Sequence, residues 1–374
     1  MSEDETDGLK LDPIQQAIDD IRAGEMIVVV DDEDRENEGD LIMAAELATP
    51  EAVAFMVRHT SGILCTPLEA SEARRLRLPP MVAENDAPLA TAFTVSVDYR
   101  HGLTTGISAE ERCATVRAMA NPNTGADDLV RPGHVFPLVA RPGGVLMRTG
   151  HTEAGVDFAK LAGLRPAGLL AELVNDDGTV MKGAQVESFA RAHGLTLVSI
   201  DALIAYRQER ETLIERVGET TFQAPIGRVR AIEYSTPYDD ARHVALVVGD
   251  LESAAAAPLV RLQRESVLDD VFGASPNAVS RMLARISEDG AGVLVYLRSG
   301  AAGVAAPGGH DVSGPPGEGA AADAKRRETW RDVGLGAQIM RDLGLKQIRV
   351  LSSRQRDYRG ASGFGVEIVE TVVI

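Results

Sequence analysis

Residues 31–40, with the sequence DDEDRENEGD, hold the densest set of groups that could do chemistry. Seven of these ten residues carry a carboxylate. A hard divalent cation such as Mg²⁺, held by one or two of the carboxylates, would relieve their mutual repulsion. The alternative interpretation is a solvated acidic turn. An EF-hand is excluded by spacing, because Asn37 stands where that loop needs glycine and Met43 where it needs glutamate.

A second candidate site is the run RTGHT at residues 148–152, which leads into a predicted helix capped by Thr152. Backbone N–H groups at a helix N-terminus, together with the guanidinium of Arg148, can bind a phosphate group. The neutral imidazole of His151 can ligate a metal ion. A metal site beside an anion site suits a phosphorylated sugar. The alternative is a plain helix cap beside a surface histidine.

Three further residues are candidates for acid–base chemistry or for lining the site. Glu172 interrupts an apolar run at 169–174, where burial would disfavour its charged form unless a cation pairs with it. It could equally face a solvated edge. His134 lies in a turn that enters a strand, a position where a lone histidine is more often structural. Cys65 is explained nearly as well as a small buried hydrophobic residue.

Alternating helices and strands must position these groups. Helix caps and apolar spacing predict helices near 13–23 (capped by Asp12), 49–60 (started by Thr49), 108–121 (capped by Ser108), 152–163 and 185–192, and from about 200. Apolar runs predict strands near 26–30, 93–97, 134–140, 168–174 and 196–198. The alternation predicts an α/β (α+β) fold in which helices pack on a mixed sheet. The acidic loop then follows directly from the strand at 26–30.

The chain of 374 residues is longer than a single hydrophobic core usually allows, so two domains are expected. A charge-dense segment begins at about residue 207, and a turn-rich segment follows at 223–227. We therefore predict a first domain at 1–208, a linker at 209–221 and a second α/β domain at 222–374.

The net charge of −18 opposes broad binding to nucleic acid or to anionic membranes, since both need clustered Lys and Arg. Only two cysteines are present, and residues 1–8 are acidic and lack an apolar segment. These features predict a cytoplasmic protein with no membrane or nucleic-acid partner.

Five motifs taken together resemble 3,4-dihydroxy-2-butanone 4-phosphate synthase over about residues 10–208. They lie in the family's order at 31–40, 104–108, 131–137, 148–153 and 172–178. The resemblance implies a carbon–carbon lyase of riboflavin biosynthesis. It would convert D-ribulose 5-phosphate into 3,4-dihydroxy-2-butanone 4-phosphate and formate, with Mg²⁺ or Mn²⁺ as cofactor.

The same resemblance implies roles for individual residues. Glu36 and His151 would bind the metal, and His134 and Glu172 would be the essential catalytic residues. The family is homodimeric with active sites shared between subunits, so His134 would act on the partner's substrate. Substrate binding would involve Arg35, Glu36, Asp40, Cys65, Thr105, Arg148, Thr149, Gly150, His151, Thr152 and Glu172.

Residues from about 222 onward resemble GTP cyclohydrolase II, through motifs at 245–250, 270–273, 292–298 and 331–338. That family holds a catalytic Zn²⁺ with three cysteines, and here those positions are Ser266, Asn277 and Val279. Thr329 replaces the catalytic aspartate, although Arg331 is kept, and a glycine-rich segment at 299–322 replaces the nucleotide-binding stretch. None of the three replacements is a good zinc ligand. We therefore predict no zinc and no GTP hydrolysis in the second half.

An inactive second half could serve in dimerisation, in stabilisation or as a regulatory site for a pathway ligand. Two other functions are weighed against the lyase. A bifunctional enzyme that also hydrolyses GTP is opposed by the missing cysteines. A non-catalytic scaffold for flavin-pathway enzymes would have no need to keep Glu36, His134, His151 and Glu172 together.

Overall fold

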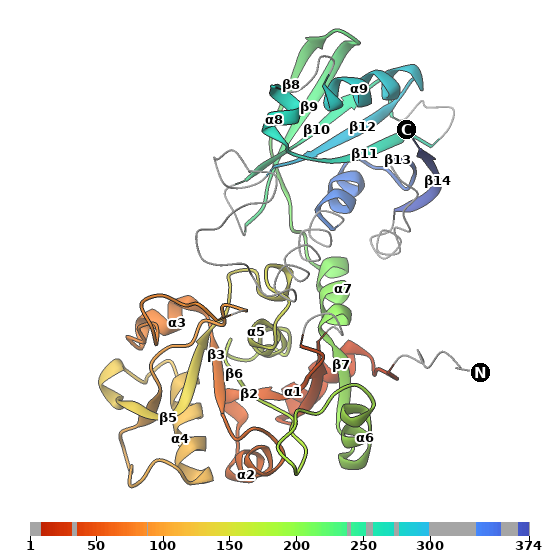
Figure 1. Ribbon diagram of the computed structural model, residues 1–374. Helices are drawn as coiled ribbons and strands as arrows, with labels where there is room; N and C mark the ends of the chain where they lie inside the picture. The colour runs from red at the N-terminus through yellow and green to blue at the C-terminus, as the bar shows by residue number, and fades with distance from the viewer. Residues whose placement is uncertain are drawn as a thin grey trace, which may run out of the picture. The chain divides into compact units, whose positions relative to one another are not determined.

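In the computed structural model, the described part of the chain forms two compact units, one up to Tyr206 and one from Arg207 (Figure 1). Each unit contains its own seven-stranded sheet. Residues 215–221, predicted as linker, lie instead in a strand. Arg35, Thr329, Arg331 and the segment at 299–322 lie outside the described residues. The structure describes residues 9–31, 36–87, 89–237, 241–251, 257–272, 277–298, 334–352 and 366–373.

The sheet of the first unit is mixed and has the order β4-β5-β3-β6-β2-β1-β7. Its inner strands β1, β2 and β3 are buried along their whole length, because helices cover both faces. The apolar run at 26–30 and the expected strands near 134–140, 168–174 and 196–198 are confirmed, but β2 and β3 were not predicted. The strands are β1 (Ile27–Val30), β2 (Gly39–Ala44), β3 (Cys65–Leu68), β4 (Val97–Tyr99), β5 (Leu129–Val139), β6 (Gly168–Glu172) and β7 (Thr196–Ser199).

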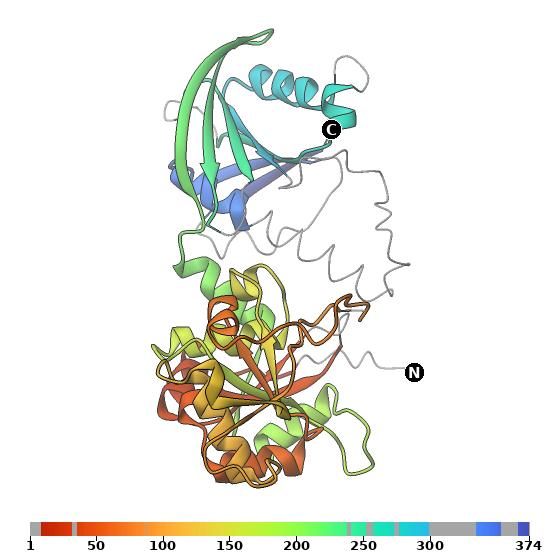
Figure 2. The same ribbon diagram turned by 90° about the vertical axis from the view of Figure 1, so that its left-hand side faces the viewer.

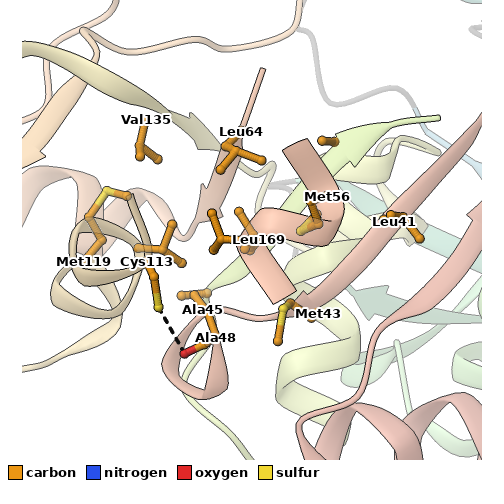
Figure 3. Close-up of a cluster of buried hydrophobic side chains, with 14 of the residues drawn as sticks. Leu41, Met43, Ala45, Ala48, Met56, Leu64, Cys113, Met119, Val135 and Leu169 are labelled. Carbon is orange, nitrogen blue, oxygen red and sulfur yellow. Dashed lines mark hydrogen bonds between the residues drawn. The ribbon is translucent and has the colours of Figure 1, made fainter. Parts of the chain in front are cut away.

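Helices pack on both faces of this sheet, so the first unit has three layers (Figures 1 and 2). One face buries apolar residues of α1, α5 and α7. On the other, Met56 of α2 and Met119 of α4 pack near Leu41 and Leu169 (Figure 3), together with residues of α6. The helices are α1 (Ile14–Ala23), α2 (Pro50–His59), α3 (Ala70–Arg75), α4 (Ala109–Ala120), α5 (His151–Leu161), α6 (Ala184–His193) and α7 (Ile200–Arg210).

Two predicted helix caps are confirmed. The side chain of Thr49 accepts a hydrogen bond from the N–H of Ala52 at the start of α2. Ser108 does the same for the N–H of Glu111 in α4. Hydroxyl oxygens satisfy N–H groups that the first helical turn leaves without partners.

Two other predicted caps are wrong. Pro13 occupies the N-cap of α1, and the carboxylate of Asp12 instead accepts from the N–H of Leu197 and from the Arg191 guanidinium. Helix α5 begins at His151 after Gly150, so Thr152 lies within its first turn. The expected strand at 93–97 is mostly isolated bridges, with β4 starting only at its end.

The second unit contains a mixed sheet of order β14-β13-β11-β12-β10-β9-β8 (Figure 1). Helix α9 packs its apolar face on this sheet. None of the described helices in either unit is long and apolar enough to cross a bilayer. The elements are β8 (Glu215–Ala224), β9 (Gly227–Ser235), β10 (Arg242–Val248), β11 (Leu259–Arg264), α8 (Val267–Val271), α9 (Ala278–Glu288), β12 (Gly292–Leu297), a helix at 334–342, β13 (Gln347–Ser352) and β14 (Glu367–Val373).

Candidate active site

Strand register gathers the candidate residues at one end of the first sheet. Asp40, at the start of β2, lies directly opposite Glu172 at the end of β6, and opposite Val29 of β1 on its other side. Cys65 starts the next strand, β3, and pairs with Leu170 of β6. Directly opposed residues project from the same face of a sheet. Asp40 and Glu172 therefore share a face, which is the one that α5 covers.

Three side chains at this end could hold a metal ion. Asp31, Glu36 and His151 each offer one ligand atom, and these atoms lie within 4.8 Å of one another. The structure thus brings together the two predicted metal ligands, Glu36 and His151. It adds Asp31, which sequence reasoning did not single out. Its position directly after the buried strand β1 was the available signal, because that strand fixes its backbone.

The orientation of His151 suits a metal ligand. Its Nε2 lies 3.0 Å from the carbonyl oxygen of Val29, which can only accept, so Nε2 carries the proton. Nδ1 then presents a lone pair on the side facing Asp40, whose Oδ1 lies 3.7 Å away. A metal-binding histidine usually donates its other N–H to a carbonyl or carboxylate in this way.

The hairpin between β1 and β2 holds Glu36 in place. The carboxylate of Asp31 accepts hydrogen bonds from the N–H groups of Glu36 at 3.2 Å and Glu38 at 2.9 Å. Asn37 adopts a left-handed conformation, with φ of 54°, that turns the chain back toward β2. At Gly39 a Cβ would come within 2.5 Å of Val186 Cγ1, so this position has no room for a side chain.

The electrostatics at Asp40 favour a cation beside this carboxylate. Asp40 is 2% exposed, and its Oδ1 has no hydrogen-bond partner among the described residues. Burial, followed by the neighbouring carboxylates of Glu172 and Glu36, raises the pKa of Asp40 well above its usual range. A bound divalent cation reverses such an effect by supplying the dominant local charge. Carboxylate oxygens with one imidazole nitrogen form a donor set that fits Mg²⁺ or Mn²⁺.

His134 is oriented by a buried carboxylate. Its Nδ1 lies 2.7 Å from Asp98 Oδ2, and its backbone N–H donates to Asp98 Oδ1 at 2.8 Å. With Nδ1 protonated by this pairing, Nε2 is the atom left to exchange protons. Gly106 packs so closely against this pair that a Cβ there would lie 2.3 Å from Asp98. Sequence reasoning missed Asp98, since an acidic residue in a short strand gives no signal by itself.

The loop before α4 places Thr105 beside Gly106. The Thr105 hydroxyl donates to Glu111 Oε2 at 3.4 Å, and Thr104 and Ser108 bond the same carboxylate. Glu111 thus ties the TTGIS motif into one turn. Through Gly106, this turn lies against the pair formed by Asp98 and His134.

Arg148 is paired with a carboxylate of the first turn of α5. Its guanidinium donates to Glu153 Oε2 at 2.7 Å, with both side chains buried, and also to Thr91 Oγ1. A Cβ at Gly150 would lie 2.3 Å from the Arg148 guanidinium, so the turn requires glycine. Because Gly150 is the N-cap of α5, it offers no side chain to the first helical turn, which also contains Thr152. Thr149 immediately precedes this N-cap.

Glu172 and Cys65 complete the site. Glu172 is half-buried at the end of its strand, as in the solvated-edge alternative, and its Oε2 accepts from Ser61 Oγ at 2.7 Å. Burial, and then the charge of Glu172, raises the pKa of the Cys65 thiol. The thiol therefore stays protonated and forms a small apolar wall rather than a nucleophile.

In the second unit, Ser266, Asn277 and Val279 are the three positions where the resemblance implies cysteines, and all three lie at the starts of helices. Asn277 Oδ1 caps α9 by accepting from the N–H of Ser280 at 2.8 Å, and Ser266 is the N-cap residue of α8. Both contact Asp270, which accepts from the N–H of Ser266 and from the Tyr296 hydroxyl. Val279 lies in the first turn of α9.

The fold and site of the first unit define a class: a three-layer α/β enzyme domain with a candidate divalent-metal site at one end of its sheet. A model of the 3,4-dihydroxy-2-butanone 4-phosphate synthase family matches residues 15–206, and a model of GTP cyclohydrolase II matches residues 215–373. The chain belongs to the 3,4-dihydroxy-2-butanone 4-phosphate synthase family. It is an enzyme of riboflavin biosynthesis with a second, GTP cyclohydrolase II domain.

Relatives and solved structures extend this match. The riboflavin biosynthesis protein RibBA of Salinispora arenicola is 46% identical, over 96% of this chain and 88% of the relative. That of Rhodococcus jostii is 45% identical, over 97% and 91%. The structure of RibBX, a two-domain 3,4-dihydroxy-2-butanone 4-phosphate synthase from A. baumannii, is 36% identical with a TM-score of 0.81, covering 97% of this chain and 100% of that chain. A synthase in complex with two magnesium ions is 44% identical with a TM-score of 0.52, covering 54% and 98%.

Proposed function

We propose that the first unit converts D-ribulose 5-phosphate into 3,4-dihydroxy-2-butanone 4-phosphate and formate. The observation that carries this proposal is the convergence of Asp31, Glu36 and His151 beside the N-terminus of α5. A metal site next to backbone N–H groups suits a substrate with both a hydroxyketone and a phosphate.

Glu36 and His151 would hold Mg²⁺ or Mn²⁺, with Asp31 and Asp40 close by. Once bound, the cation supplies Lewis acidity to the carbonyl and hydroxyl oxygens of the sugar. The first turn of α5, with residues 148–152, would orient the phosphate. The buried ion pair between Arg148 and Glu153 stabilises that turn.

Two side chains are placed for proton transfer. His134, held by Asp98, would take and return protons through Nε2. Glu172, half-buried at the strand end and bonded to Ser61, would act as the second acid–base group. Asp40, Thr105, Cys65 and Arg35 would line the substrate. We further propose a cytoplasmic homodimer in which His134 serves the partner's site. Both cysteines are free, as expected in a reducing compartment.

The test is incubation of the full chain with ribulose 5-phosphate and Mg²⁺, with formate as the readout. We expect formate release that EDTA abolishes and that Glu36→Ala reduces by at least about 100-fold, in line with loss of a metal ligand. Absence of formate at every concentration of Mg²⁺ and Mn²⁺ would refute the lyase function.

We propose that the second domain, with boundaries near 222–374, binds no zinc and does not hydrolyse GTP. The support is that the Asn277 side chain caps α9 and that the backbone N–H of Ser266 donates to Asp270, at positions where the resemblance implies thiolates. The full chain, loaded with Zn²⁺ and GTP, should release no pyrophosphate. Thermal unfolding with and without GTP or flavin then separates a regulatory site, which shifts the midpoint, from a stabilising module, which does not.

The bifunctional enzyme is the second candidate function. The match of the GTP cyclohydrolase II model to residues 215–373 favours it. Release of pyrophosphate from GTP by the zinc-loaded chain would establish it and overturn the inactive second domain.

A further inference from the structure

Lys182 connects the loop after β6 to the acidic hairpin. Its Nζ donates a hydrogen bond of 2.8 Å to the backbone carbonyl oxygen of Glu36. Lys182 is exposed, and no carboxylate of the described residues lies within ion-pair distance of its ammonium group. Its partner is therefore the backbone of the residue whose side chain faces His151 and Asp31.

The segment that contains Lys182 is held by backbone contacts with the residues that follow β6. Val174 bridges to Val180, and the N–H of Met181 donates to the carbonyl of Leu173 at 3.0 Å, which continues the backbone pairing beyond β6. The N–H of Lys182 itself donates to Gln185 Oε1 at the start of α6. Lys182 is thus anchored to the strand that ends in Glu172 and to the helix that follows.

The same segment contacts the hairpin at a second point. Val186, one turn along α6, packs where a side chain at Gly39 would stand, with 2.5 Å between Val186 Cγ1 and a Cβ built at Gly39. The segment therefore contacts the hairpin at two positions: Lys182 bonds to Glu36, and Val186 packs against Gly39. Within the hairpin, the Asp31 carboxylate accepts two N–H bonds, and the N–H of Asp31 donates to the carbonyl oxygen of Glu38 at 3.2 Å.

We infer that Lys182 is a positioning residue that holds Glu36 in the conformation that binds the metal. The inference rests on the proposed function of Asp31, Glu36 and His151 as a divalent-metal site. A tether and a bare charge have opposite effects. As a tether, Lys182 favours metal binding by keeping the carboxylate of Glu36 in place. As a positive charge alone, it would repel the cation, and its removal would tighten binding.

Direct titration of Mn²⁺, followed by electron paramagnetic resonance, separates these effects on the full chain. We expect Lys182→Met to weaken Mn²⁺ binding by about three- to tenfold, the size of one hydrogen bond at a partly solvated position. Lys182→Arg, which keeps a donor, should stay within about twofold of the wild type. Lys160→Met is the matched control. Lys160 is an exposed lysine in the last turn of α5, away from the hairpin, and its Nζ lies 2.7 Å from the Glu69 carboxylate.

Unchanged or tighter Mn²⁺ binding in Lys182→Met would overturn the inference, as would equal weakening by Lys182→Arg and Lys182→Met. Formate release supplies an independent readout. A positioning role predicts that a higher Mg²⁺ concentration restores the kcat of Lys182→Met, whereas a lost proton-transfer group would not be restored. Failure of the wild type to bind Mn²⁺ would instead count against the metal site itself, so the two ideas fail separately.

Discussion

Replacing Asp98 with asparagine tests the proposed role of His134 most directly. Asp98 is buried, and its two oxygens accept from the backbone N–H and from Nδ1 of His134. Asparagine fills the same volume and can keep one acceptor for the backbone N–H. Its amide NH₂ would then face Nδ1, which forces the proton onto Nε2 and removes the lone pair that the reaction needs.

The magnitude follows from the bond that is lost. A hydrogen bond to a charged group is worth about 1.5–3 kcal/mol, and each 1.4 kcal/mol is a factor of ten. We therefore expect Asp98→Asn to reduce kcat by about 10- to 150-fold. The KM for ribulose 5-phosphate should change little, because Asp98 lies behind the histidine and not in the substrate site.

The assay is steady-state formate release, with circular dichroism to confirm that the variant is folded. Asp128→Asn is the matched control. Asp128 pairs with the exposed His101 at 2.7 Å in the same Asp–His arrangement, but neither residue belongs to the site. If Asp98→Asn, folded and metal-bound, kept the wild-type kcat, the tautomer argument for His134 would be refuted.

Three further predictions concern the hairpin, the metal-free site and the second domain. Gly39→Ala should lower activity by at least about tenfold, because the added methyl group meets the stiff Val186, and Val186→Ala should partly restore it. Burial and neighbouring carboxylates raise the pKa of Asp40, so the fold favours its protonated form and loses stability as pH rises above about 4. In EDTA, Asp40→Asn should therefore raise the melting temperature at pH 8 more than at pH 5. Addition of Mg²⁺ should make the increases at the two pH values more similar. An equal increase at both pH values in EDTA would contradict the raised pKa of Asp40. Tyr296→Phe removes a 2.6 Å hydrogen bond to Asp270 and should lower the midpoint of the second domain by about 2–6 °C in calorimetry.

Much of the local structure follows from the chain's own pattern. Thr49 and Ser108 start their helices as predicted, because a hydroxyl that accepts from an N–H three residues on is a contact within one helical turn. Thr152 fails as a cap because α5 begins one residue before it, at His151. Asp12 finds partners about 180 residues away, on Arg191 and Leu197, that outweigh a local cap.

For the candidate site too, some features follow from the sequence and others only from the structure. The motifs identify Glu36 and His151, and the structure brings them together with Asp31. The motifs suggest that Arg148 helps to bind a phosphate group, and the structure pairs its guanidinium with Glu153 five residues along. A sequence does not reveal that pairing, because whether an arginine turns inward depends on how the turn at Gly150 packs.

By itself, the sequence determined the chemistry that is available: a carboxylate-rich loop after a buried strand, a histidine at a helix start, and Ser266 and Asn277 in the second domain. These are properties of residue type and short-range spacing. Only the tertiary structure decided which groups meet. Asp40 faces Glu172 through strand register, His134 finds Asp98, and Lys182 reaches the carbonyl of Glu36 across 146 positions of the chain. Such contacts depend on how distant strands align, and a shift of one residue in register would turn each side chain to the opposite face.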